Sequence, residues 1–334
     1  MCTRFEQVII EVADVALTPP VALAPMAGIT DVPFRQIVAG FGAGLVVSEM
    51  VASQEMVQAK PGVRERAELG FGEAATAVQI AGRDAYWMGQ AARMLEDNGA
   101  RIIDINMGCP AKKVTGGASG SALMKAPDHA LSLIEAVVNA VGVPVTLKMR
   151  LGWDDACLNA PVIARRAEAA GITMLTIHGR TRCQFYKGRA DWVAIGEVVK
   201  AVDIPVLANG DITGAASARV ALAASGAAGI MVGRGAQGAP WRLAEIAAEL
   251  WGTPAPVIPT GPDLAELICT HYAASLDFYG VALGARAIRK HLGWYLDEAG
   301  IDPAVKRRIQ TAAPDAVPGL LRAAFDRAPA QVAA

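Results

Sequence analysis

The sequence is poor in the residues that build cross-linked and metal-bound folds. Its five cysteines, at positions 2, 109, 157, 183 and 269, are odd in number and show no CxxC spacing, and its four histidines do not fall at metal-ligand intervals near them. Disulfide frameworks and structural zinc sites need paired or closely spaced ligands. We therefore expect neither a disulfide scaffold nor a bound metal.

Long apolar runs are also lacking. No stretch approaches the roughly 18 apolar residues of a membrane span, and the first twenty residues carry acids where a signal peptide needs a continuous apolar core. We expect a cytoplasmic protein without a membrane partner. The formal net charge of −1 neither predicts nor excludes a nucleic-acid partner, because a local basic face decides that question.

Glycine and alanine, by contrast, are plentiful between regular runs of valine, isoleucine and leucine. Hydrophobic residues make up 53% of the 334 residues and aromatic residues only 5%. This composition is typical of an α/β protein in which helices pack closely on strands. The length accommodates one large domain and one small domain.

Eight short apolar runs bounded by Gly, Pro or Asp recur along the chain. They cover residues 21–28, 44–50, 75–82, 101–108, 144–150, 174–180, 205–211 and 229–235. Between them, segments such as 85–100 and 128–143 repeat apolar residues at helical spacing, and strands that alternate with helices pair in parallel. Eight such units predict a (β/α)8 TIM barrel, with a doubly wound open sheet as the alternative.

Nearly every run ends in a distinctive residue, and this favours the barrel, because barrel enzymes build their sites from the loops that follow the strands. In chain order these residues are Met26, Glu49, Gln79, Asn106 with Cys109, Lys148 with Arg150, His178 with Arg180, Asn209 with Asp211, and Gly233 with Arg234. We expect all of these residues to lie around one opening, the mouth of the barrel, at the carboxyl ends of the strands.

The composition and periodicity of the sequence change after residue 250. Residues 251–263 are rich in Pro and Gly and indicate a linker, and helices are expected at 263–280, 282–300, 304–312 and 318–328. We therefore predict a barrel domain over residues 1–250 and a small all-helical domain over residues 251–334. A monomer is expected.

The loops after the seventh and eighth runs predict a phosphate-binding corner. They contain Gly210, Gly233 and Gly235, which supply backbone N–H groups, and Arg234, which can meet two phosphate oxygens at once. The alternative is that these glycines only permit tight turns. Their position on the last two runs favours the phosphate.

The other strand ends suggest what the phosphate belongs to. Met26 and Ala27 on one side, with Gln79 and Lys148 between them and the phosphate corner, suit a flat conjugated ring with polar edges, which indicates a flavin. Lys148 follows an apolar strand, where a charge needs a partner, and the N1 and O2 edge of a reduced flavin is anionic. The alternatives are a solvated lysine at the strand rim and, for His178, a satisfied core histidine.

Several motifs resemble one known family in order and content. They are APMAGITDVPFR (24–35), SEM (48–50), VQIAG (78–82), DINMGCPAKKV (104–114), GSALM (120–124), KMRLGW (148–153), TIHGRTR (176–182), NGDI (209–212) and MVGRGAQGAPW (231–241). Together they resemble the tRNA-dihydrouridine synthases, specifically the bacterial B-type branch, and GCP within DINMGCPAKK is the most specific element. The helical tail also resembles the tRNA-facing domain of that family.

The resemblance implies a cofactor, an activity and a set of residues. It implies reduction of particular uridines in the D-loop of tRNA to dihydrouridine, by a flavin that NADPH reduces. Cys109 is implied as the proton donor. FMN is implied to be held by Pro25, Met26, Ala27, Gln79, Lys148, His178, Asn209, Gly210, Asp211, Gly233 and Arg234.

The chemistry of this reaction gives a reason for a cysteine. Hydride from the reduced flavin adds at C6 of uracil, and the resulting enolate must be protonated at C5. A thiol, with an ordinary pKa of about 8.5, is mostly protonated at neutral pH and is small enough to lie against a ring. No base adjoins Cys109, whereas a nucleophilic cysteine would need one. The alternative is a buried structural thiol; we favour the acid, with Asn106 on the uracil edge.

Basic and aromatic residues alternate over 179–192, a mixture that suits RNA backbone contact and base stacking. In the tail, Arg286, Arg289 and Lys290 lie three and four residues apart and would share one helix face, although such a face is often merely solvated. We predict tRNA contacts at Arg150, Arg180, Arg182, Arg286, Arg289 and Lys290.

Two competing functions remain open at this point. One is a flavin barrel that oxidises or reduces a free pyrimidine, against which the basic tail argues. The other is a binding protein that uses the barrel without turnover, against which Cys109, Lys148 and His178 argue.

Overall fold

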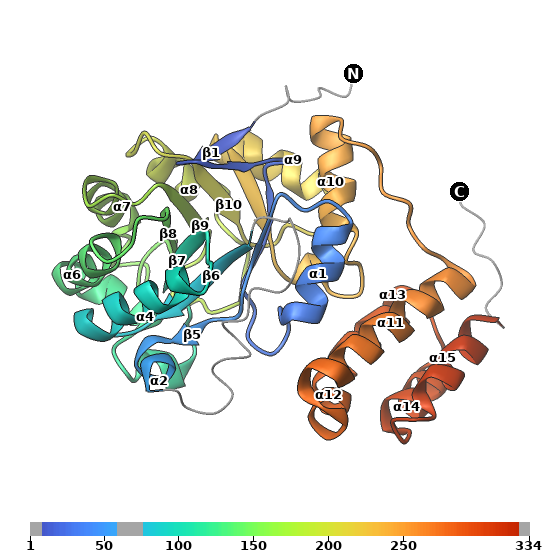
Figure 1. The fold of residues 1–334 in the computed structure, drawn as a ribbon. Coiled ribbons are helices and arrows are strands. Elements are labelled where there is room, and N and C mark those ends of the chain that lie inside the picture. Colours follow the sequence, from blue (N-terminus) through green and yellow to red (C-terminus); the bar gives the residue numbers. More distant parts are fainter. Residues whose placement is uncertain (1–8, 59–75, 327–334) are drawn as a thin grey trace.

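A closed parallel barrel forms the larger part of the molecule (Figure 1). The computed structural model describes residues 9–58 and 76–326. The barrel strands are β3 (Val21–Leu23), β4 (Leu45–Val47), β6 (Thr76–Ala81), β7 (Ile102–Met107), β8 (Val145–Arg150), β9 (Met174–His178), β10 (Val206–Asn209) and β11 (Gly229–Val232). The ring closes where β11 pairs with β3 and β4 pairs with β6. The predicted TIM barrel is confirmed, and each of the eight predicted runs contains one strand.

A layer of helices surrounds the barrel. These helices are α1 (Val32–Gly40), α2 (Ser53–Val57), α4 (Ala85–Asp97), α6 (Pro127–Val138), α7 (Ala160–Ala169), α8 (Trp192–Val199), α9 (Ala215–Ser225) and α10 (Arg242–Trp251). Aspartate side chains cap three of them: Asp31, Asp84 and Asp191 each accept a hydrogen bond from an amide in the first turn of α1, α4 and α8. Helices α4 and α6 correspond to the segments predicted at 85–100 and 128–143.

A hairpin that the sequence did not suggest closes the other end of the barrel. Strands β1 (Ile10–Val12) and β2 (Val15–Leu17) pair in antiparallel fashion, and their alternate apolar side chains are buried. They belong to one apolar cluster with Ile102, Met174 and Leu207, which lie at the starts of barrel strands. The hairpin therefore covers the amino ends of the strands, opposite the carboxyl ends that line the cavity described below. A further short strand, β5 (Val51–Ala52), pairs with β6.

Within the described part of the carboxyl-terminal domain there are five helices: α11 (Gly261–Tyr279), α12 (Val281–Ala287), α13 (Arg289–Glu298), α14 (Pro303–Thr311) and α15 (Val317–Asp326). Helices follow the barrel as predicted, but the helix expected over 282–300 is divided at Ile288. The last two residues of the helix expected over 318–328 lie outside the described residues. Among the described residues, every helix is too short or too polar to span a lipid bilayer.

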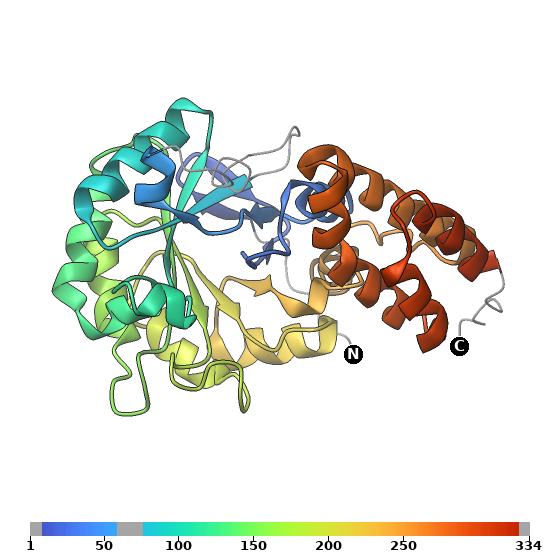
Figure 2. The ribbon, with the colours of Figure 1, turned by 90° about the horizontal axis from the view of Figure 1, so that it is seen from below.

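The helical domain packs beside the mouth of the barrel, against α1 and the loop that precedes it (Figure 2). The ring of Phe34 lies 4.6 Å from that of His291 and 5.9 Å from that of His271. His291 Nε2 donates to the carbonyl of Ile29 at 3.1 Å. Since Ile29 also lines the cavity described below, the two domains meet at the mouth.

Burial at this interface disfavours charge on its titratable side chains. Burial lowers the pKa of His291 to about 4, although its bond to the Ile29 carbonyl acts the other way and the nearby Lys290 lowers it further. The pKa of His271 is well below its usual value, because of burial and then of His291. Burial raises the pKa of Asp31 to about 6.

These pKa shifts predict acid lability. Both histidines have a higher pKa in the unfolded chain, so the stability they contribute is lost as the pH falls below about 6.5; Asp31, with a raised pKa, acts in the opposite direction. His291→Asn keeps an N–H donor but does not titrate. The free energy of unfolding of the wild type should fall between pH 7 and pH 5, and we expect this fall to be about 2 kcal/mol smaller in His291→Asn. Chemical denaturation at the two pH values measures it. The exposed His129→Asn should leave this dependence unchanged.

Candidate active site

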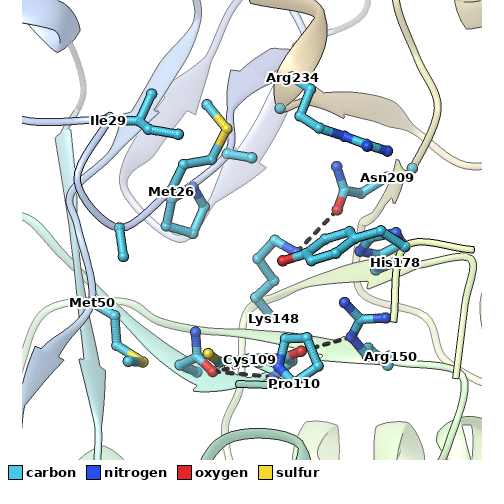
Figure 3. A pocket seen from close by; sticks show the side chains of 18 of the residues that line it. Met26, Ile29, Met50, Cys109, Pro110, Lys148, Arg150, His178, Asn209 and Arg234 are labelled. Carbon is cyan, nitrogen blue, oxygen red and sulfur yellow. Dashed lines mark hydrogen bonds between the residues drawn. The ribbon is translucent and has the colours of Figure 1, made fainter. Parts of the chain in front are cut away.

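A cavity of about 630 Å³ opens at the carboxyl ends of the barrel strands (Figure 3). The predicted site residues that line it are Pro25, Met26, Ala27, Gln79, Asn106, Cys109, Lys148, Arg150, His178, Asn209, Gly210, Asp211, Gly233 and Arg234. The structure thus brings together predicted residues from the ends of seven barrel strands, whereas Glu49, which was expected at the same mouth after β4, lies outside the lining. Five predicted tRNA contacts, Arg180, Arg182, Arg286, Arg289 and Lys290, lie outside this lining.

A buried chain of hydrogen bonds begins at Asp104, within β7. Its carboxylate accepts from Gln79 Nε2 and from Thr146 Oγ1, both at 2.6 Å. Burial raises the pKa of Asp104, and the two hydrogen bonds and the nearby Lys148 act against this rise. Gln79 Oε1 in turn accepts from Asn106 Nδ2 at 2.7 Å. Since both ends of the Gln79 amide are bound, its orientation is fixed, and through it that of Asn106.

Cys109, which has a free thiol, is the next residue in this chain of hydrogen bonds. Asn106 Oδ1 accepts from the amides of Gly108 and Cys109, at 3.2 and 3.0 Å. Cys109 is half-buried and lines the cavity, where Figure 3 shows it next to Pro110. The buried chain therefore ends at the backbone of a cysteine that faces the cavity.

Lys148 projects into the middle of the cavity from β8 (Figure 3). Its ammonium group donates to Asn209 Oδ1 at 3.0 Å, and Asn209 Nδ2 donates to the carbonyl of Met231 at 2.8 Å. Burial, followed by the charge of Arg150, lowers the pKa of Lys148 to about 8. A buried ammonium with one neutral partner is suited to bind an anionic ligand atom.

Arg150, the last residue of β8, ties two loops of the mouth together. Its Nε donates to the carbonyl of Gly108 at 2.7 Å, and its Nη1 donates to the carbonyls of Thr181 and Phe185 at 2.9 and 2.8 Å. Burial lowers its pKa only to about 10, so the guanidinium stays charged at neutral pH. Its donors hold the loops that follow β7 and β9.

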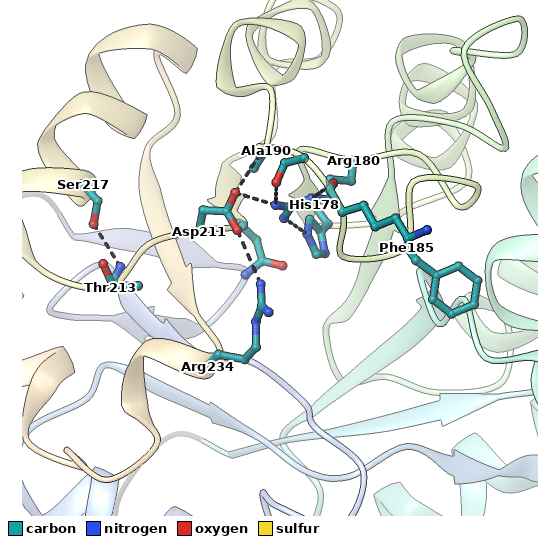
Figure 4. A network of polar contacts seen from close by, with 12 residues as sticks. His178, Arg180, Phe185, Ala190, Asp211, Thr213, Ser217 and Arg234 are labelled. Carbon is teal, nitrogen blue, oxygen red and sulfur yellow. Dashed lines mark hydrogen bonds and ion pairs between the residues drawn. The ribbon is translucent and has the colours of Figure 1, made fainter. Parts of the chain in front are cut away.

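Arg180, which is buried, forms an ion pair with Asp211, a part-exposed residue of the cavity wall (Figure 4). Asp211 Oδ2 accepts from Arg180 Nη2 at 2.6 Å and from the amide of Ala190 at 2.8 Å, and Arg234 lies 3.5 Å from Oδ1. Burial would raise the pKa of Asp211, but the hydrogen bonds and charges of its partners outweigh it and hold the pKa below its usual value. Arg180 is only 1% exposed, and its other donors bind the carbonyls of Lys187 and Gly188.

His178 is held in its neutral form. Nη1 of Arg180 lies 3.3 Å from His178 Nε2, and because a guanidinium only donates, Nε2 must accept. Burial, followed by the charges of Lys148, Arg150, Arg180 and Arg234, keeps the pKa of His178 well below 6.5. A neutral imidazole therefore lines the cavity at physiological pH.

The predicted phosphate corner lies between Asp211 and Gly233. Gly210 has φ +115°, and a Cβ there would stand 2.8 Å from Ala190 Cβ and 3.0 Å from His178 Cδ2, so only glycine fits. A Cβ at Gly233 would stand 3.7 Å from both Ala24 and Met26, in the space that the cavity lining bounds. The side chain of Arg234 is 58% exposed at this corner. Backbone without side chains beside an accessible guanidinium is suited to a phosphate.

Some site residues were not identified from the sequence. Asp104 and Thr146 support Asn106, through Gln79, from within the strands. Tyr186, which the sequence indicated only as one aromatic residue of the segment 179–192, lines the cavity, and Arg150 and Arg234 lie over its ring at 5.6 and 5.4 Å. An acid in the middle of the apolar run RIIDIN was the signal for Asp104, because a buried carboxylate requires partners. No signal in the sequence indicates which ring will lie beside two arginines.

The fold and the site together define a barrel enzyme with a thiol and a buried ammonium facing one cavity. The model of the family described as "Dihydrouridine synthase (Dus)" matches residues 22–324. The chain therefore belongs to the dihydrouridine synthase family, whose members are flavoenzymes, and the resemblance seen in the sequence is confirmed.

The sequence is similar to those of several named proteins over most of their length. The chain is 64% identical over 311 residues to "Probable tRNA-dihydrouridine synthase" of Rhodobacter capsulatus, covering 92% of this chain and 95% of the relative. It is 56% identical over 277 residues to a protein of the same name from Rhizobium leguminosarum, covering 83% and 85%. It is 48% identical over 285 residues to "tRNA-dihydrouridine synthase B" of Salmonella typhimurium, covering 85% and 88%.

Proposed function

We propose that this enzyme reduces uridines in the D-loop of tRNA to 5,6-dihydrouridine, with FMN in the cavity, NADPH as the reductant and Cys109 as the proton donor. The observation that carries the proposal is the position of Cys109. A hydrogen bond to its amide fixes its backbone at the edge of the cavity, and Lys148 projects into the centre of the same cavity. The similarity to proteins named as tRNA-dihydrouridine synthases supports the choice of substrate.

The residues of the cavity suit FMN. The segment from Pro25 to Ala27 forms an apolar wall for the ring, and the corner of Gly233 and Arg234 suits the phosphate. The Lys148 ammonium provides a cation for the anionic N1 and O2 edge, while Asn209 fixes its direction. When bound, the reduced flavin supplies the hydride that adds at C6 of uracil.

The chain itself then supplies the proton and the orientation of the base. Cys109 donates a proton from Sγ to C5 of the uracil ring, and the thiolate that remains is reprotonated from solvent. Asn106 uses Oδ1 for two amides and one hydrogen of Nδ2 for Gln79, so the second hydrogen of Nδ2 is available for a uracil oxygen. We assign Arg150 and Arg180 to positioning the loops around the base, because their donors bind protein carbonyls.

Cations at the rim of the mouth are placed to receive the RNA backbone. The guanidinium of Arg182 lies 4.7 Å from the ring of Trp153 and 5.1 Å from that of Phe185, and Lys125 lies 4.9 Å from the ring of Trp153. The aromatic rings of Trp153 and Phe185 hold these two cations in place but do not neutralise their charge. This arrangement combines charge and stacking surfaces, as single-stranded nucleic acid requires.

The tail presents further cations next to the mouth. Arg286, on α12, and Arg289 and Lys290, on α13, are exposed. Lys290 Nζ lies 3.8 Å from the position of a Cβ on Gly28, in the loop that follows β3. We assign these cations to the tRNA as well, since they continue the basic rim onto the helical domain.

Replacing Arg182 tests the rim contact. Arg182→Ala is expected to weaken tRNA binding about tenfold at low salt and to lower the slope of log affinity against log salt by about one, because one phosphate contact is lost. Filter binding or fluorescence anisotropy across a salt series measures both values. Arg165→Ala, an exposed arginine on α7, is the matched control and should change neither. An unchanged salt slope in Arg182→Ala contradicts the assignment.

Mass spectrometry of cellular tRNA tests the function as a whole. In cells that lack this protein, one D-loop dihydrouridine is expected to disappear, and a plasmid-borne copy should restore it. If no tRNA position changes, the proposed substrate is wrong.

A further inference from the structure

Ser121, a residue to which the reaction assigns no role so far, holds the carbonyl group of Cys109. Ser121 Oγ donates to this carbonyl at 2.8 Å, and the amide of Ser121 donates to the same oxygen at 3.1 Å. The side chain of Ser121 is completely buried, in the short helix η1 (Gly120–Lys125). It is therefore shielded from solvent and acts only through its neighbours.

The residue before Ser121 packs against the same cysteine. Gly120 has φ +59°, and a Cβ there would lie 2.9 Å from the carbonyl oxygen of Cys109 and 3.3 Å from its Cβ. Any side chain at position 120 would therefore push against the backbone of Cys109. The start of η1 touches the cysteine through two consecutive residues.

Cys109 is thereby held on both sides. Its amide donates to Asn106 Oδ1, its carbonyl accepts from Ser121, and the preceding carbonyl, that of Gly108, accepts from Arg150 Nε at 2.7 Å. These partners come from the end of β7, from η1 and from the end of β8. With the backbone fixed, the position of Sγ depends on a single rotatable bond, between Cα and Cβ.

We propose that Ser121 is a positioning residue that fixes the thiol of Cys109 in the geometry for proton transfer to the substrate base. The inference rests on the proposed role of Cys109 as the proton donor. A transferred proton requires donor and acceptor within hydrogen-bonding reach, and a misplacement of about 1 Å can cost two orders of magnitude in rate. Ser121 acts on the rate of this step and not on the affinity for tRNA, because it is buried and its hydroxyl and amide both donate to the Cys109 carbonyl.

The test uses the flavin-loaded enzyme with two neighbouring serines. In Ser121→Ala, we expect the single-turnover rate of flavin oxidation by tRNA to fall about tenfold, with the tRNA concentration at half-saturation changed less than about twofold. Ser119→Ala is the matched control, because Ser119 Oγ bonds the carbonyl of Val114 in the same segment and not Cys109. It should keep the wild-type rate.

A second readout follows the thiol without any substrate. Iodoacetamide is added to the folded holoenzyme, and alkylation of Cys109 is followed over time by peptide mass spectrometry. Ser121→Ala is expected to change the alkylation rate at least about threefold, because the Cys109 carbonyl then keeps only the amide of residue 121 of its two Ser121 donors, and the looser backbone lets Sγ sample other positions; Ser119→Ala should not change this rate. If Ser121→Ala does not yield a folded holoenzyme, Ser121→Cys keeps the volume with only a weak donor and is expected to change both readouts in the same direction.

Cys109→Ala separates failure of this inference from failure of the proposed function. If Cys109→Ala keeps the wild-type rate, the proton donor is wrong and the function must be revised. If Cys109→Ala loses the rate while Ser121→Ala matches Ser119→Ala in both rate and alkylation, the positioning role of Ser121 is overturned and the proposed function stands. A slower turnover together with altered alkylation in Ser121→Ala supports the inference.

Discussion

Cys109→Ala is expected to lower the single-turnover rate of uridine reduction by about 10² to 10⁴, the range that a positioned general acid contributes. Alanine removes the sulfur atom and leaves Cβ in place, so the variant cannot deliver the proton that the proposed reaction needs at C5. The backbone bonds from Asn106 and Ser121 do not involve the thiol, so the loop should keep its shape. Stopped-flow oxidation of the reduced flavin by tRNA measures the rate.

The other half of the reaction provides an internal control. In the proposed reaction, reduction of the flavin by NADPH requires no proton at uracil C5, so Cys109→Ala should keep its wild-type rate in that step, and tRNA binding should also be unchanged. Cys183→Ala is the matched control among the thiols, since Cys183 is an exposed free cysteine in the loop after β9. If Cys109→Ala slows both half-reactions equally, the variant has disturbed the cavity and the role of proton donor is not supported.

Arg180→Met is expected to destabilise the folded protein by about 2 to 4 kcal/mol, the second large effect that the structure predicts. Methionine fills part of the volume but leaves the carboxylate of Asp211 with only Arg234, at 3.5 Å, and the amide of Ala190. It also removes the donors that bind the carbonyls of Lys187 and Gly188. The free energy of unfolding from urea denaturation measures the loss.

The pH dependence of this loss identifies its cause. The pKa of Asp211 is depressed in the folded protein, so the stability it contributes is present above its ordinary value of 3.8 and is lost as the pH falls through the folded pKa. The difference between Arg180→Met and the wild type should therefore narrow at acid pH, where a protonated Asp211 needs no cation. Arg189→Met, on the exposed part of the same loop, should change stability by less than about 0.5 kcal/mol at any pH. A constant difference across the pH range would mean that lost packing, not the ion pair, is responsible.

Much of the fold was visible in the sequence because strand periodicity and strand ends are local properties. Runs such as 101–108 and 144–150 are buried on both faces, which gives them continuous apolar character and makes their ends easy to find. The amino-terminal hairpin was missed because its three-residue strands alternate buried and exposed residues and give no continuous apolar run, unlike the equally short barrel strands β3 and β4. The division at Ile288 was missed because its backbone is itself helical, so no Pro or Gly marks it.

The arginines show where local patterns fail. Arg180 and Arg182 lie two residues apart in GRTRCQFYKGRADW and were assigned the same role. The structure buries Arg180 against Asp211, which is 31 residues away in the chain, and leaves Arg182 at the rim between two rings. Nothing within the segment distinguishes the two arginines, because Asp211, the partner that holds Arg180 in a buried position, follows another strand.

The sequence by itself determined the eight units, the order of the strand ends and the motif that contains Cys109, because each is written in contiguous residues. Only the tertiary structure decided which of these groups touch one another. The chain from Asp104 through Gln79 to Asn106, the bond from Ser121 to the Cys109 carbonyl and the contact of His291 with Ile29 join residues that are distant in sequence. The physical reason is that buried polar groups must find partners, and closure of the barrel determines which partners lie within reach.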